Sequence, residues 1–148
     1  MALVLLNPDQ WKDGDFSSAV FSRKRLKQGA QSVCRVAHST AAEIRRHVVG
    51  PQIAKDPSRT LVGGAVAICE DIRSITASDG LTRLFCVVDA PVINGKTGDY
   101  LGHAHLGFSE PTNVDGFWNL NDRTAALAQL TDAFRKFTVP DSLESIFQ

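Results

Sequence analysis

The segment 99–110 constrains the fold most, because its residues alternate in character with a period of two. One side of this segment carries Tyr100, Gly102, Ala104, Leu106 and Phe108, and the other carries Asp99, Leu101, His103, His105 and Ser109. Successive side chains of a β-strand point to opposite faces of the sheet, so this pattern is typical of a half-buried strand. The chain is therefore expected to build a sheet with a core on one face.

Three further stretches predict strands. Residues 16–21 are expected to form a short strand, and residues 32–38 a second one. Residues 81–88 are too continuously apolar to face water on alternate sides, so this stretch is expected to be the central strand of the sheet. A flexible connection at residues 94–98 then leads into the alternating segment.

The residues Thr40-Ala41-Ala42-Glu43 have the pattern of a capping box at the start of a helix. In this motif the threonine hydroxyl accepts a first-turn N–H, and the glutamate side chain reaches back to the cap. Ile44 and Val48 would share the buried side of that helix. The dipeptide Gly50-Pro51 is expected to end it.

Two longer stripes of apolar residues repeat at spacings of three, four and three, which is the spacing of one helix face. The stripes are Ala65, Ile68, Ile72 and Ile75, and Leu127, Leu130, Phe134 and Phe137. Asn121 or Asp122 would cap the second helix, which is expected to run through about Phe137. A short closing helix is expected after Pro140, with its start at residues 141–144.

The order of these elements lacks the strict alternation of strands and helices that a doubly wound parallel sheet requires. The predicted class is α+β, with a small, mostly antiparallel sheet and helices packed on one face. A length of 148 residues with 43% hydrophobic residues is that of one ordinary domain, so residues 1–148 are expected to form a single globular domain.

Charge and cysteine content narrow the class of protein further. Sixteen basic residues balance sixteen acidic ones, which excludes a strongly basic protein that coats DNA. Cys34, Cys69 and Cys86 are an odd number, form no C-x-x-C pair and lie in apolar stretches, so they are interpreted as inert thiols. Such usage favours the reducing cytoplasm.

No targeting segment or membrane span is expected from the sequence. The apolar residues 2–6 have no positive charge ahead of them and are too few for a secretion signal. The longest later apolar run, residues 61–69, is too short to cross a bilayer. We therefore expect a cytoplasmic protein that makes no membrane contact.

His103 and His105 are the first candidates for chemistry. Their H-x-H spacing on a strand places two imidazoles on one face, where they can share a metal ion or a phosphate. Asp99 lies on the same face, and Asp89 ends the preceding predicted strand, so a carboxylate could complete the site. The alternative interpretation is that both histidines are ordinary surface residues.

A second candidate combines Arg35 and His38 with the helix start at Thr40. The free N–H groups of a helix start favour an anion, and an arginine and a histidine beside it would strengthen that preference for phosphate or carboxylate. The alternative is that Thr40 only caps its own helix. If the strands that carry His38 and His105 share a sheet, the two candidates converge on one cleft.

The third candidate is the basic run Arg23-Lys24-Arg25-Leu26-Lys27, which could contact several phosphates. A solvated turn or helix end is the competing interpretation, because no interleaved aromatic residues support stacking on bases. The run keeps nucleic acid open as a partner.

Common catalytic motifs are absent, including the P-loop, dinucleotide-binding, nucleophile-elbow, zinc-protease and EF-hand patterns. No cofactor is predicted. The first function hypothesis is a binding or regulatory module that acts by protein contact. The alternative is a small hydrolase or nuclease-like enzyme that acts on a phosphate-containing substrate, with His103, His105 and His38 as acid–base groups and Arg35 orienting phosphate.

Overall fold

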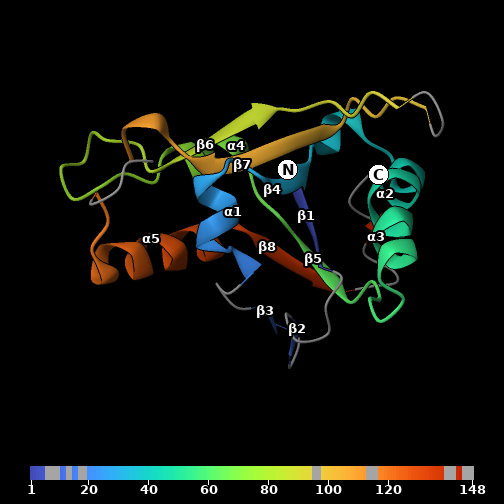
Figure 1. Cartoon of the computed structure of the whole chain (residues 1–148). Helices are drawn as coiled ribbons and strands as arrows, with labels where there is room; N and C mark the ends of the chain where they lie inside the picture. Colours follow the sequence, from blue (N-terminus) through green and yellow to red (C-terminus); the bar gives the residue numbers. More distant parts are fainter. Residues whose placement is uncertain are drawn as a thin grey trace.

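Six strands, spread along the chain from residues 2–5 to residues 135–138, form one antiparallel sheet (Figure 1). The computed structural model describes residues 1–5, 11–12, 15–16, 20–94, 98–112, 117–138 and 143–144. The six strands are β1 (Ala2–Leu5), β4 (Gln31–Cys34), β5 (Gly63–Val66), β6 (Phe85–Asp89), β7 (His103–Phe108) and β8 (Arg135–Thr138), in the order β6-β7-β4-β1-β5-β8. A separate pair joins β2 (Trp11–Lys12) to β3 (Asp15–Phe16). The predicted α+β class with an antiparallel sheet is confirmed.

The alternating segment forms β7, which pairs with β6 on one side and β4 on the other. Ala104 and Leu106 have no exposed surface, whereas His103 and His105 on the other side are half-buried. The strand prediction and its two faces are therefore confirmed for residues 103–108. The strand begins at His103 instead of Asp99, and Tyr100 packs with Cys34 and not on the side of Ala104 and Leu106. Because both edges of β7 are paired, its register is fixed from two sides.

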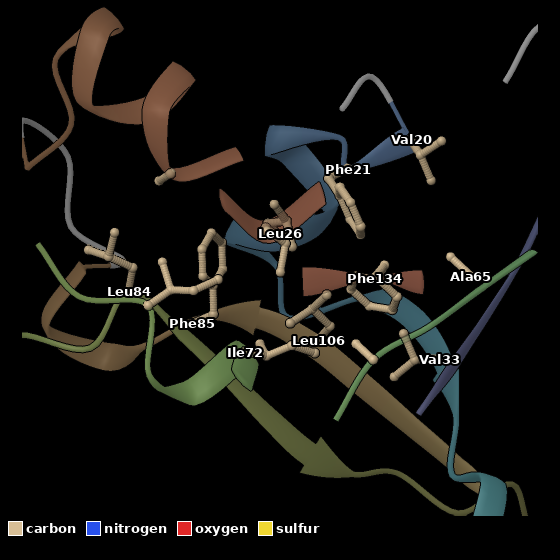
Figure 2. Packing of buried hydrophobic residues seen from close by; sticks show 14 of the residues in the cluster. Val20, Phe21, Leu26, Val33, Ala65, Ile72, Leu84, Phe85, Leu106 and Phe134 are labelled. Carbon is tan, nitrogen blue, oxygen red and sulfur yellow. The ribbon is translucent and has the colours of Figure 1, made fainter. Parts of the chain in front are cut away.

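The larger core lies on the face of the sheet that carries Val33, Ala65 and Leu106. The helices α1 (Arg23–Lys27), α4 (Cys69–Arg73) and α5 (Leu120–Ala133) contribute to this core. The buried residues labelled in Figure 2 are Val20, Phe21, Leu26, Val33, Ala65, Ile72, Leu84, Phe85, Leu106 and Phe134. Full burial of a Leu, Ile or Phe side chain contributes about 1.5–3 kcal/mol, so this cluster is the main source of stability.

A second, smaller cluster consists of Cys34, Ile44, Val49, Tyr100 and Leu143. It borders the helices α2 (Ala41–Ile44) and α3 (Gly50–Lys55), which lie at the opposite end of the sheet from α5 (Figure 1). Cys34 follows Val33 directly in β4, and neighbouring strand residues face opposite ways. The second cluster therefore lies on the other face of the sheet.

The capping box at Thr40 is confirmed, because Thr40 Oγ1 accepts from Glu43 N at 3.2 Å and Glu43 Oε2 accepts from Thr40 N at 2.8 Å. The predicted stop at Gly50-Pro51 is wrong. A π-helical turn spans Arg45–Val49, where Gly50 N donates to Arg45 O, and α3 continues to Lys55. The wide turn removes the clash that Pro51 would cause inside an α-helix, so the proline lies in the first turn of α3.

The helix predicted over residues 65–75 is wrong in its first half. Gly63–Val66 is strand β5, which pairs with β1 and with β8, and α4 begins only at Cys69. Ile68, expected in the buried stripe, is 61% exposed. The sheet offers β5 two complete backbone ladders, and this tertiary pairing overrides the local helical spacing.

The same pairing shortens the last predicted helix. Asn119 caps α5, with its side chain accepting from Asp122 N, and the helix ends at Ala133 instead of Phe137. Phe137 lies in β8, opposite Gly64 of β5. The prediction of a buried face is confirmed for Leu130 and Phe134. The expected closing helix lies largely outside the described residues.

The remaining strand predictions are corrected in extent or place. Residues 85–89 form β6, which lies at the edge of the sheet and is not central. The strand predicted over 32–38 ends at Cys34 and is followed by a 3₁₀ turn, Val36–His38. Of the strand predicted over 16–21, Phe16 belongs to β3, Phe21 lies in a bend, and residues 17–19 fall outside the described part of the chain. Among the described helices, none has the length and apolar composition to cross a bilayer.

Candidate functional site

Polar side chains meet at the end of the sheet where β4 and β6 finish and β7 begins. Arg35 Nη1 donates to Asp89 Oδ2 at 2.8 Å, and Arg35 Nη2 donates to Leu101 O at 2.6 Å. His103 Nδ1 lies 2.6 Å from the carbonyl oxygen of Ala90, the residue after Asp89. Arg35 and His103 thus contact consecutive residues at the end of β6, and the convergence of the two candidates on one cleft stays a prediction.

His103 and His105 form a contacting pair on the half-open face of β7. Their ring centroids lie 4.9 Å apart, with the ring planes at 84°. A carbonyl oxygen only accepts, so His103 Nδ1 must carry the proton that it donates to Ala90 O, and the Nε2 of a neutral His103 is then free of a proton. Burial, and then the charge that His103 can carry, lower the pKa of His105. The lowered pKa favours the neutral form of the His105 ring.

The anion pocket predicted at Arg35, His38 and Thr40 is occupied by the chain's own groups. The Glu43 carboxylate takes the N–H of Thr40, and Arg35 already binds Asp89 and a backbone carbonyl. His38 is exposed at the end of its 3₁₀ turn, and its backbone carbonyl packs against Gly102, just before His103. Phosphate binding by Arg35 and Thr40 stays a prediction. A phosphate would have to displace Asp89 and Leu101 O from Arg35, and the Glu43 carboxylate from Thr40 N.

The basic run forms the short helix α1. Arg23, Lys24, Arg25 and Lys27 are exposed, while Leu26 is fully buried and fixes the helix to the core. The helix is followed by Gly29, whose Cα would lie 2.7 Å from a Cβ at position 107. Gly107 therefore allows the loop after the basic run to approach β7 closely. Phosphate contact by Arg23, Lys24 and Arg25 stays a prediction.

Sequence reasoning missed an exposed apolar surface along the β6–β7 hairpin. The hairpin continues beyond the strands, because Val92 and Tyr100 exchange two backbone hydrogen bonds of 3.0 and 2.8 Å. The surface, here called the hairpin patch, consists of Val88, Val92, Ile93 and Leu101, which are 58%, 37%, 70% and 60% exposed. The sequence contains one indication of this exposed surface, since Leu101 is an apolar residue on the polar side of the alternating segment 99–110.

The cysteines take no part in this site. All three are free, Cys34 is buried and the other two are half-buried. Burial raises the pKa of Cys34, so its thiol stays protonated and unreactive at neutral pH. Within the described part of the chain, no three His, Cys, Asp or Glu side chains are grouped to hold a metal ion.

No protein-family model, curated protein or solved structure matches this chain. Two features of the structure bear on function. They are the polar end of the sheet around His103 and the hairpin patch beside the edge strand β6.

Proposed function

We propose that the chain is a protein-binding module that adds an extended segment of a partner protein to the free edge of β6. The observation that carries the proposal is the place of β6 at the end of the sheet order, where β7 is its one partner among the described strands. Unpaired strand edges are templates for pairing with another chain, and β-strand addition is a common mode of peptide recognition.

The hydrogen-bond pattern indicates which groups of β6 are available. Ala90 N donates to His103 O, so in the antiparallel alternation the backbone groups of Val88 and Cys86 face β7. The groups of Val87 and Asp89 then point outward, away from the sheet. An extended peptide laid along β6 would pair with these groups, and its side chains would lie beside the exposed Val88.

The surface around β6 favours a segment that is apolar at alternate positions and acidic at one end. The hairpin patch supplies apolar surface at the Asp89 end of the strand. At the Phe85 end of the strand, Arg83 is exposed. Arg73 of α4 lies near Cys86 of β6, because its positive charge lowers the pKa of the Cys86 thiol, which burial raises. Two arginines at one end of the edge would attract a carboxylate of the partner.

A peptide-binding experiment tests the proposal. Labelled ten-residue peptides of alternating valine and threonine would be compared by fluorescence anisotropy, one ending in two glutamates and one in two lysines. We expect the acidic peptide to bind more tightly. Val88→Lys should weaken its binding by about tenfold, because a lysine on an edge strand opposes strand addition.

Ile68→Lys is the matched control, because Ile68 is 61% exposed and lies before α4, outside β6 and the hairpin patch. It should leave peptide binding unchanged. Amide exchange of Val87 and Asp89 should slow when the peptide binds, since new backbone hydrogen bonds protect these outward-facing amides. Equal weakening by both lysine variants, or no binding of either peptide, contradicts the proposal. A concentration-dependent dimer that Val88→Lys abolishes would identify a second copy as the occupant and would also overturn it.

A second proposed function is the His-dependent hydrolase or nuclease-like activity on a phosphate-containing substrate. It is supported by Arg35, His103 and Asp89 at one end of the sheet. Hydrolysis of a chromogenic phosphodiester that the His103→Ala, His105→Ala double variant loses while remaining folded would support this function. Equal rates for the two proteins would refute it.

We further propose a cytoplasmic location for this module. The support is that all three cysteines are free thiols, as the reducing cytoplasm favours. Fractionation of cells that express the tagged chain tests the location.

A further inference from the structure

We propose that His103 and His105 form a chelating pair for a divalent transition-metal ion of the zinc or nickel type, with water in the remaining coordination positions. This site is independent of the peptide edge proposed above, because both ligands lie on β7 and the peptide would pair with β6. Imidazole nitrogen suits these ions, which prefer it to the carbonyl and carboxylate oxygen that magnesium and calcium select.

The separation of the two rings fits a shared ion. A Zn–N bond of about 2.1 Å and a tetrahedral angle place the centroids of two bound imidazoles about 5 Å apart. The centroids of His103 and His105 are 4.9 Å apart. Both residues lie on the same face of one strand, whose register is fixed by β4 and β6. The backbone thus holds the two rings at a centroid separation that is compatible with a shared ion.

The hydrogen bond from His103 to Ala90 adds a second argument. Histidines that bind metals almost always donate their other ring N–H to a carbonyl or a carboxylate, which fixes the tautomer and the ring orientation. His103 Nδ1 makes this contact with Ala90 O at 2.6 Å, leaving Nε2 as the free donor atom to the ion. The Ala90 carbonyl therefore has the place of an outer-shell partner in such a site.

The neighbours of the pair leave it accessible. His105 lies between Ser32 of β4 and Val88 of β6, both of which are exposed, and the two histidines are themselves only half-buried. His103 lies next to Cys34, whose thiol is buried. An ion can therefore reach the two rings from solvent, and small side chains next to His105 leave room for its water ligands.

Zinc titration followed by calorimetry tests the proposal. We expect one Zn²⁺ per chain, and His103→Gln or His105→Gln should each weaken binding by about tenfold or more, since each removes one of two protein ligands. His38→Gln is the matched control, because His38 is exposed and is not part of the pair. It should leave the affinity unchanged. Cys86→Ser tests the half-buried thiol of β6 and should also have no effect.

Paramagnetic broadening by Ni²⁺ provides a second measurement that needs no substitution in the pair. We expect the amide signals of His103, His105 and their neighbours Ser32 and Val88 to broaden first. Broadening centred elsewhere overturns the proposal, as does zinc binding that survives in the two histidine variants or is lost in Cys86→Ser. The absence of zinc binding at millimolar concentration overturns it as well.

Discussion

Leu106 lies at the centre of the core and has no exposed surface. Its strand is paired on both sides, with Gln31 of β4 and Val87 of β6 opposite it, so the backbone cannot move in to fill a cavity. Leu→Ala substitutions in cores cost about 2–5 kcal/mol, with the higher values where the site cannot collapse. We therefore expect Leu106→Ala to lower the free energy of unfolding by about 3–4 kcal/mol.

Equilibrium unfolding in urea measures this effect. With an m-value of about 2 kcal/mol/M, the midpoint should fall by roughly 2 M while the m-value itself stays constant. Leu101→Ala is the matched control, because Leu101 precedes the same strand and is 60% exposed. Its cost should be below about 0.5 kcal/mol. Equal midpoints for the two variants would refute the central place of Leu106 in the core.

Four further outcomes are expected. Ala104→Asp should abolish the near-ultraviolet circular dichroism of the folded chain, because it puts a charge at a position with no exposed surface, and a native spectrum would contradict the strand register. Thr40→Ala should lower the free energy of unfolding by about 0.5–2 kcal/mol in urea, and Thr40→Ser should restore most of it, since the hydroxyl caps α2. Gly102→Ala should lower the melting temperature through a loss of about 1–3 kcal/mol, because its Cβ would lie 2.6 Å from His38 O, and an unchanged melting temperature would show that the loop yields. If α1 binds polyanions, Lys24→Ala with Arg25→Ala should flatten the salt dependence of heparin binding, and an unchanged slope would leave these side chains as solvated surface.

The parts of the candidate site that lie on one strand could be predicted from sequence. The two-residue spacing alone places His103 and His105 on one face, and the structure confirms that they share it. The bond between Arg35 and Asp89 joins residues 54 positions apart, and nothing local to either residue indicates it. The hydrogen bond from His103 to Ala90 likewise depends on the hairpin register, which pairing between strands decides.

The exposed surface was the least predictable feature. Residues 81–88 have the composition of a central strand, yet β6 has one strand neighbour among those described, and Val88 is open to solvent. A continuous apolar run indicates that a strand can be buried on both faces. It does not indicate whether another strand is present to cover its edge, because strand order is a property of the whole sheet.

The sequence by itself determined the features that depend on a few neighbouring residues. These are the two faces of β7, the capping box at Thr40 and the buried side of α5. The tertiary structure alone decided that residues 63–66 and 135–138 pair as strands, although both stretches continue helical stripes. A strand satisfies its backbone groups through a distant partner, whereas a helix satisfies them within itself, so local spacing cannot distinguish the two when such a partner exists.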